Sequence, residues 1–97
     1  MRLLTLGTIK LFWENHADAK FVLKAWVKTV QRAQWCCFAD VKKEYSSADV
    51  LPGNRVVFNI KGNKYRIVVK IHYNTKFMFV RFIGTHAEYD KIDAETI

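Results

Sequence analysis

Cysteine is scarce in this 97-residue chain: the only two, Cys36 and Cys37, are neighbours. Adjacent cysteines rarely form a useful cross-link, and a metal site would need further ligands nearby, which the sequence lacks. These features argue against a disulfide framework and a structural metal, and we expect no cofactor. We predict that both thiols are reduced and partly buried in a cytoplasmic protein, with redox sensing as the alternative.

Long apolar runs are also missing. No stretch approaches the roughly 18 apolar residues of a membrane span, because Lys10, Glu14 and Arg81 interrupt the best candidates. The apolar stretch after Arg2 ends at Lys10, too early for a secretory signal. With 51% hydrophobic and 26% charged residues the composition is that of a globular protein. The length predicts one domain over residues 1–97, without a membrane partner.

The most informative absence is that of acidic residues between Val50 and Ala87. Outside this stretch nine Lys and Arg balance nine Asp and Glu, so the whole formal net charge of +7 lies within it. The stretch is also rich in β-branched and aromatic residues, which favour strands. Concentrated positive charge on a rigid sheet predicts a surface that binds phosphate groups. The basic residues concerned are Arg55, Lys61, Lys64, Arg66, Lys70, Lys76 and Arg81.

The first half of the chain has the apolar spacing of helices. Ile9, Phe12 and Trp13 are three and four residues apart, and Thr8 is the expected cap of their helix. A second helix should contain Asp18 in its first turn, and a short third helix is expected over 40–45. The second helix is predicted to bury Phe21, Val22, Ala25, Trp26, Thr29 and Val30 and to expose Lys20, Lys24, Lys28 and Arg32. Its basic side indicates a solvated face or, alternatively, a surface for a membrane or a partner.

From Val50 onward the apolar period changes to two, which indicates strands. Turns at Gly62-Asn63 and Asn74-Thr75 divide the stretch into a three-stranded antiparallel meander. The predicted pairs on the apolar side are Val56/Val69, Phe58/Ile67, Ile60/Tyr65, Ile71/Met78, Val69/Val80 and Ile67/Phe82. The other side, called the basic face below, is predicted to carry Arg55, Asn59, Lys61, Lys64, Arg66, Lys70 and Arg81. The predicted fold is α+β, with two to three N-terminal helices packed on a curved antiparallel sheet of three to four strands.

The basic face has an energetic cost that suggests a function. Like charges on neighbouring strands destabilise a sheet by about 0.2–1 kcal/mol per facing pair. Lysines that only protect a sheet edge against aggregation would be scattered, whereas these charges converge and include three arginines. Phosphate binding therefore explains the pattern better than solubility does.

His86 follows the last predicted strand, at the rim of the basic face. One helical turn there would bring His86, Tyr89 and Asp90 to the same side. An imidazole titrates near neutral pH, so His86 is either a structural residue or a proton-transfer group. His16, in a turn between helices, and His72, at the far end of the basic face, are weaker candidates. Because the face lacks carboxylates to hold Mg²⁺, phosphodiester chemistry there is expected to be metal-free, with the 2′-hydroxyl of RNA as nucleophile.

Several segments resemble the HigB family of bacterial type II toxins. They are Phe12–His16, Ala25–Trp26, Asn54–Arg66 and Arg81–Ile92. The chain departs from the family pattern at Ala17, where proline is expected, and at Cys36-Cys37, where polar residues are usual. The resemblance implies a RelE-like fold and an mRNA interferase that cuts messages on the translating ribosome. It also implies a HigA-type helix-turn-helix antitoxin, with operator DNA bound only through the toxin–antitoxin complex.

We therefore interpret the chain as a metal-independent endoribonuclease toxin. Cationic groups would stabilise the charge on the scissile phosphate, and acid–base groups would move protons. The predicted phosphate-binding residues are Arg66, Arg81 and Lys64. His86 is predicted to transfer a proton, with Lys61 or Tyr89 as the complementary group. The residues predicted to hold flanking RNA are Arg55, Lys70, Asn59 and Lys91. Two alternatives use the same face: a non-catalytic RNA- or DNA-binding module, and a subunit that docks on an acidic partner segment.

Overall fold

A five-stranded sheet organises the computed structural model, which describes all 97 residues. The strand order is β1-β5-β4-β3-β2, and every neighbouring pair is antiparallel except β1 and β5, which are parallel. The strands are β1 (Arg2–Leu3), β2 (Asp49–Leu51), β3 (Arg55–Ile60), β4 (Tyr65–His72) and β5 (Phe77–Thr85). The predicted α+β class is confirmed, but the sheet has two additional edge strands. Each is two or three residues long, too short for a period of two to be visible in the sequence.

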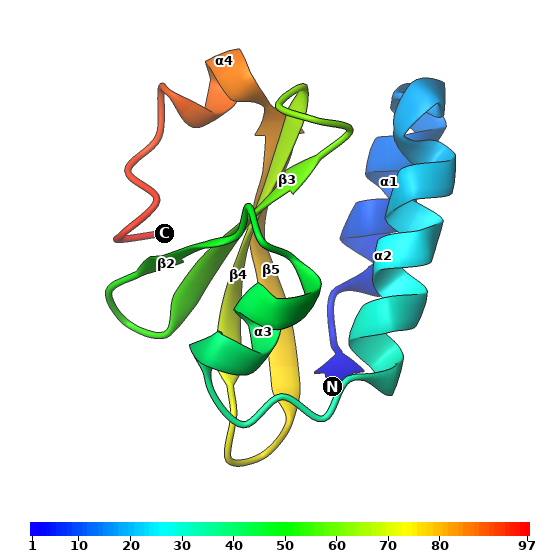
Figure 1. The fold of residues 1–97 in the computed structure, drawn as a ribbon. Coiled ribbons are helices and arrows are strands. Elements are labelled where there is room, and N and C mark those ends of the chain that lie inside the picture. The colour runs from blue at the N-terminus through cyan, green and yellow to red at the C-terminus, as the bar shows by residue number, and fades with distance from the viewer.

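The helices lie mainly on one side of this sheet. They are α1 (Leu6–Asn15), the 3₁₀ turn η1 (Ala17–Ala19), α2 (Lys20–Arg32), α3 (Phe38–Glu44) and α4 (His86–Tyr89). Figure 1 shows α1 and α2 side by side along one face, while the C-terminal segment runs along the other side of the molecule. None of the helices is long and apolar enough to cross a lipid bilayer.

The main core lies between the helices and the sheet. Ile9, Leu23 and Val30 from the helices are fully buried there, as are Ile67 and Met78 from the strands. Full burial of such side chains contributes about 1.5–3 kcal/mol each, which makes this layer the chief source of stability. The core fixes one face of the sheet against the helices and leaves the other face for function.

The helix predictions need two corrections. Thr8 lies inside α1, whereas Thr5 precedes the helix and its Oγ1 accepts a hydrogen bond from the Val80 amide at 2.7 Å. In α2 the buried residues are Leu23, Trp26, Val27 and Val30, while Phe21 is 83% exposed and Val22 and Ala25 are also exposed. The predicted stripe was therefore rotated around the helix. Apolar residues surround much of α2, so their spacing alone cannot select the side that faces the sheet.

The predicted strand register is confirmed for β3 and β4, including Phe58 opposite Ile67. Between β4 and β5 it holds as far as Val80, which faces Val69. A β-bulge then leaves Arg81 without a partner, so that Phe82 faces Val68 and Ile83 faces Ile67. The predicted Ile67/Phe82 pair is wrong for this reason. The bulge moves Phe82 to the basic face, because one extra residue reverses the alternation of side chains.

The two cysteines follow α2, and the structure corrects their predicted burial. Both are free thiols, as predicted, but both are exposed. Lys76, from the turn between β4 and β5, donates a hydrogen bond to the Trp35 carbonyl at 2.8 Å and lies 3.4 Å from the Cys36 sulfur. Lys76 therefore ties this loop to the sheet and does not contribute to the basic face.

Candidate active site

The β3–β4 turn meets the end of β5 and the α4 helix that directly follows it at one end of the sheet. In β4, Arg66 faces Asn59 on one side and Gly84 on the other. The main-chain amide of His86 donates to the carbonyl of Lys64 at 3.2 Å, which attaches the start of α4 to the turn. Strand pairing thus holds Asn59 and Arg66, and the main-chain hydrogen bond holds Lys64 beside His86.

The short helix α4 is fixed by a capping box. The Thr85 hydroxyl accepts from the Glu88 amide at 3.1 Å, and the Glu88 carboxylate accepts from the Thr85 amide at 2.8 Å. This hydrogen bond from the backbone lowers the pKa of Glu88. Gly84 permits the arrangement, since a Cβ there would lie 2.7 Å from the Phe82 ring and 3.1 Å from the Glu88 carboxylate. The helix is therefore locked against the sheet although it has only four residues.

His86 has a carboxylate partner on its own helix. Its Nδ1 lies 3.3 Å from Oδ2 of Asp90, one turn further on, as the predicted spacing requires. A carboxylate at Nδ1 favours the tautomer with the proton on that nitrogen. The other nitrogen, Nε2, is then available to accept and release a proton. This is the arrangement expected of a general acid–base group.

Arg66 is a half-buried guanidinium without an acidic partner. Its Cζ lies 4.6 Å from the centre of the Tyr89 ring, and its Nε is buried without a hydrogen-bond partner. The Tyr89 ring in turn contacts Phe82, with 6.3 Å between ring centres. The side-chain oxygen of Asn59 is likewise buried and unpartnered, while its Nδ2 donates to the Ser47 carbonyl at 3.0 Å. An arginine held over an aromatic ring and lacking a carboxylate is suited to bidentate phosphate binding.

Further cations extend along the same face. Arg81 is exposed at the bulge, with its Cζ 5.8 Å from the centre of the Phe79 ring, and Lys70 lies between Arg55 and Phe79 in the strand register. Neither Arg81 nor Lys70 forms an ion pair, because the ion pairs of the protein involve only Asp18 and Asp90. Arg55 donates from Nε to the Ile97 carbonyl at 2.8 Å and is therefore partly engaged. Lys91, in the C-terminal segment, is exposed.

Lys61 and Lys64 are not free on the basic face, contrary to the prediction. Both ammonium groups contact the carboxylate of Asp18 in η1, Lys61 at 3.3 Å. The hydroxyl of Tyr65, a buried residue of β4, donates to the same carboxylate at 2.7 Å. The hydrogen bond from Lys64, followed by that from Tyr65, holds the pKa of Asp18 well below its usual range. The same hydrogen bonds from these two groups to Asp18 raise the pKa values of Lys64 and Tyr65.

Asp18 is the residue of this region that sequence reasoning missed. Its position suggested the first turn of a helix, and its three partners follow it by 43 to 47 residues. No pattern in the sequence around Asp18 indicates contacts with residues so far along the chain. His16 lies nearby, stacked on Phe12 with ring centres 4.0 Å apart, which gives it a structural role at the end of α1.

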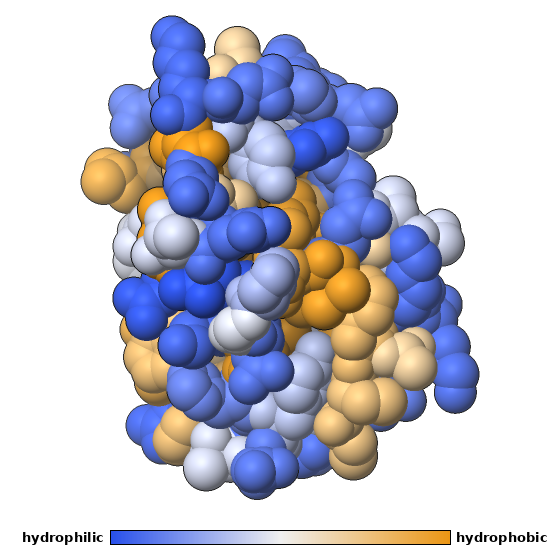
Figure 2. All heavy atoms as spheres, turned by 90° about the vertical axis from the view of Figure 1, so that its left-hand side faces the viewer, coloured by the Kyte–Doolittle hydropathy of each residue, from blue (hydrophilic) through white to orange (hydrophobic).

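The basic face is a cationic surface with an apolar centre. Val57 and Val68 are buried there against Ala94 of the C-terminal segment, together with half-buried Phe82 and Ile92. Figure 2 shows this side of the molecule, with hydrophilic side chains surrounding a smaller apolar area. None of the cavities in the protein is lined by the predicted catalytic residues. An open surface of this kind suits a polymer better than a small molecule.

The fold and the site define a small α+β protein with an open cationic face on its sheet. The family model described as HigB_toxin, the RelE-like toxic component of a toxin–antitoxin system, matches residues 19–92. This match covers most of the chain, so the protein belongs to the HigB toxin family, and a partner antitoxin follows from that membership. The chain is 27% identical over 92 residues to the mRNA interferase toxin HigB of Escherichia coli strain K12, covering 93% of this chain and 88% of the relative. Proteins named mRNA interferase HigB from Escherichia coli O157:H7 and Shigella flexneri give the same values.

Proposed function

We propose that this protein is an endoribonuclease that cleaves mRNA as the toxin of a type II toxin–antitoxin system. The observation that carries the proposal is Arg66, a half-buried guanidinium stacked on Tyr89 without an acidic partner, next to the α4 helix that presents His86. The names of the relatives agree with this chemistry. An alternative is a non-catalytic RNA- or DNA-binding module that uses the same face.

In the proposed reaction the 2′-hydroxyl of RNA attacks the adjacent phosphorus. The 2′-oxygen–phosphorus bond forms, the bond to the 5′-oxygen breaks, and the products are a 2′,3′-cyclic phosphate and a 5′-hydroxyl. Arg66 and Arg81 stabilise the additional negative charge on the phosphorane, whereas Lys64 contributes only after its ammonium leaves the Asp18 carboxylate. His86 moves one proton through Nε2 while Asp90 holds Nδ1. The complementary proton transfer is assigned to Lys61, after it leaves the Asp18 carboxylate, or to the Tyr89 hydroxyl, which Tyr89→Phe tests.

The proposed reaction needs no metal ion. The carboxylates nearest the site have other contacts, since Glu88 caps α4 and Asp90 contacts His86. We expect cleavage of a short free RNA, if free RNA is a substrate, to continue in the presence of EDTA. On the translating ribosome, where we propose that cleavage normally occurs, chelation would also disrupt the ribosome and cannot serve as the test. The proposed partner is a HigA-type antitoxin, and the mRNA substrate places the activity in the cytoplasm.

Replacing His86 with alanine tests the proposal. Removal of a general acid–base group is expected to lower the cleavage rate by about 10²- to 10⁴-fold. Growth inhibition should disappear as well, while RNA affinity and the unfolding midpoint stay nearly unchanged. Growth arrest is scored after induced expression, and cleavage is scored on translated message and on RNA carrying a single 2′-deoxy position.

The matched control is His72→Ala, which removes an exposed imidazole at the far end of the same face. We expect this variant to retain toxicity. If His86→Ala cleaves message as fast as the wild type, the assigned role of His86 is wrong. If the wild type binds RNA tightly but leaves translated message intact, the binding-module alternative replaces the nuclease.

A further inference from the structure

A second cationic surface extends from the helical side of the sheet to its β1 edge and takes no part in the proposed reaction. It consists of two adjoining hollows that share Gln31. The first, about 510 Å³, lies between α1 and α2 and is lined by Leu6, Lys10, Trp13, Lys24, Val27, Lys28 and Gln31. The second, about 580 Å³, lies between β1 and the C-terminal end of α2 and is lined by Met1, Arg2, Leu3, Gln31, Gln34, Thr75, Lys76 and Phe77. We call the two hollows together the α2 groove.

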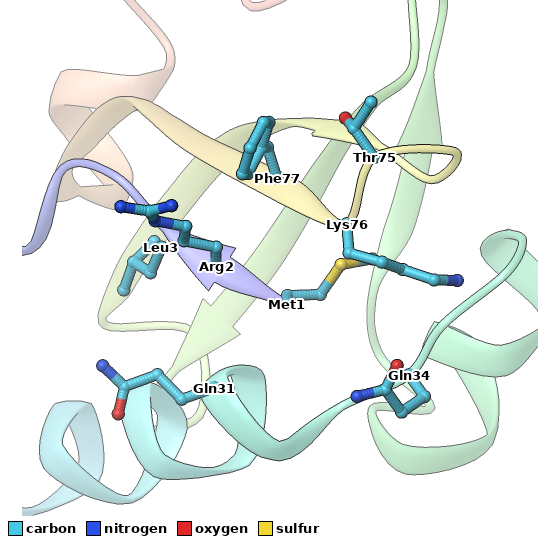
Figure 3. A pocket seen from close by; sticks show the side chains of 8 residues that line it. All are labelled: Met1, Arg2, Leu3, Gln31, Gln34, Thr75, Lys76 and Phe77. Atoms are coloured by element: carbon cyan, nitrogen blue, oxygen red, sulfur yellow. The ribbon is translucent and has the colours of Figure 1, made fainter.

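The chemistry of the α2 groove is amphipathic. Its lining contains five cations and no carboxylate, while Leu6, Trp13 and Val27 form an apolar floor in the first hollow. Lys24 reaches over the Trp13 ring, with its Nζ 5.8 Å from the ring centre. In the second hollow, shown in Figure 3, Arg2 and Lys76 lie on the strand side and Gln31 and Gln34 on the helix side. Positive charges around an apolar floor favour a ligand that has one acidic side and one apolar side.

The dimensions favour a helix rather than a small molecule. Lys24 and Lys28 are one turn apart on α2, and Gln31 follows almost one turn later, so the first hollow alone extends about 10 Å along α2 at 1.5 Å per residue. A helix laid in such a groove would direct its apolar ridge at the floor and its carboxylates at the lysines. α2 itself contains four basic and no acidic residues, so this side of the molecule repels cationic partners.

We infer that the α2 groove docks an acidic amphipathic helix of a partner protein. RNA is the less suitable occupant, because a phosphate backbone has no group that fills an aliphatic floor. Single-stranded bases stack on aromatic platforms, and the two aromatic rings of the groove, Trp13 and Phe77, lie in different hollows and each already has a cation over it. The first hollow lies on the opposite side of the sheet from the basic face, the second lies at the β1 edge, and neither is lined by the predicted catalytic residues. A partner can therefore occupy the groove without covering Arg66, Arg81 or His86.

The test uses a designed peptide of about 18 residues, long enough to be helical, with leucine along one face and glutamate elsewhere. Its binding to the intact ¹⁵N-labelled protein is followed through backbone amide shifts. We expect shifts at Lys10, Trp13, Lys24, Val27 and Gln31 and none at Arg66 and Arg81. A second peptide with lysine in place of glutamate should not bind.

Two double variants with equal charge changes on the same helix locate the site. Lys24→Glu with Lys28→Glu should weaken peptide binding roughly tenfold, as expected for reversing two partly exposed charge contacts. Lys20→Glu with Arg32→Glu, outside the groove, should weaken it by less than about threefold. No groove shifts with the acidic peptide, shifts confined to the basic face, or equal losses in both variants would overturn the inference. The inference would also be overturned if an RNA oligonucleotide or anionic phosphatidylglycerol vesicles shifted the amides of the groove residues more than the acidic peptide does. Because binding alone is measured, the result is independent of nuclease activity.

Discussion

Tyr89 offers the site two different chemical groups, an aromatic ring and a hydroxyl. The ring lies under the Arg66 guanidinium, with its centre 4.6 Å from Cζ. Phe82 supports the ring from the sheet. This geometry explains how a long, flexible arginine can be held in one orientation without a carboxylate that would neutralise it. We therefore expect the ring of Tyr89 to matter more than its hydroxyl.

Two substitutions separate these roles. Tyr89→Phe keeps the stacked ring and should leave the single-turnover cleavage rate within about twofold of wild type. Tyr89→Leu removes the ring and should lower the rate by roughly five- to thirtyfold, the equivalent of about 1–2 kcal/mol. If Tyr89 instead supplied the complementary proton, Tyr89→Phe would cost about 10²- to 10⁴-fold. Rates are measured at saturating enzyme, so that differences in RNA affinity do not enter.

Single residues also show which contacts could be predicted from the sequence and which could not. The placement of Arg66 on the face opposite the core followed from alternation, and the structure agrees. The contact between His86 and Asp90 followed from their spacing of four residues. The stacking of Arg66 on Tyr89 did not follow, because side chains 23 positions apart meet only once the C-terminal turn is folded onto the sheet. Lys61 and Lys64 were assigned to the basic face for the same reason: their distant partner Asp18 was not recognised.

Among the elements, η1 and the β3–β4 turn form a clamp at the end of the sheet that carries the site. Asp18 joins them by contacts to Lys61, Lys64 and Tyr65. Its folded-state pKa lies below the ordinary value of about 3.9. The carboxylate therefore contributes stability that is fully present above about pH 4 and is lost as the pH falls through the folded pKa.

Asp18→Asn is expected to lower the melting temperature at neutral pH. As the pH falls below about 4, Asp18 takes up a proton in the unfolded chain before it does so in the folded protein, so the difference between the two proteins should shrink. Thermal unfolding followed by circular dichroism between neutral and acidic pH measures this difference. The control is Asp49→Asn, which removes an exposed carboxylate without an ion pair and should behave like wild type. A difference that stays constant with pH would show that Asp18 does not act through its charge.

The central strands of the sheet were more predictable from the sequence than the bulge in β5 and the two edge strands. The β3–β4 hairpin, with its apolar side and register, followed from alternation, because shifting it by one residue would bury lysines. The bulge at Arg81 was invisible, since Phe82 and Ile83 are both apolar and either could face the core. The strands β1 and β2 also escaped prediction because they are stabilised by pairing with distant strands and not by a local pattern.

At the scale of the whole molecule, the two faces of the sheet are both cationic but differ in character. The helical side carries the α2 groove with its apolar floor, and the basic face carries Arg66, Arg81 and Lys70 around a small apolar centre. Sequence reasoning recognised the excess charge of residues 50–87 and, for the lysines of α2, favoured a solvated face over a surface for a membrane or a partner. Charge counting along the chain cannot show that two basic regions lie on opposite sides of a sheet.

The salt dependence of RNA binding distinguishes these two sides. Each phosphate contact made by a cation on single-stranded RNA contributes about 0.7 to the slope of log K against log salt concentration, because it releases condensed counterions. Arg66→Gln together with Arg81→Gln should therefore weaken binding and reduce the magnitude of the slope by about 1.4. The measurement is a fluorescence-anisotropy titration at several salt concentrations, in a His86→Ala background that keeps the RNA intact.

Lys20→Gln together with Arg32→Gln provides the control, since it removes the same net charge from the helical side. If RNA lies on the basic face, this pair changes only the long-range field, which is screened within about 8–10 Å at physiological salt, and the slope should stay as in the parent protein. An equal fall in slope for both pairs would mean that RNA responds to total charge and has no preferred face. An unchanged slope for the Arg66 and Arg81 pair would mean that these arginines do not contact phosphate. The proposed nuclease mechanism would then lose its two principal charge-stabilising groups, whatever the role of His86.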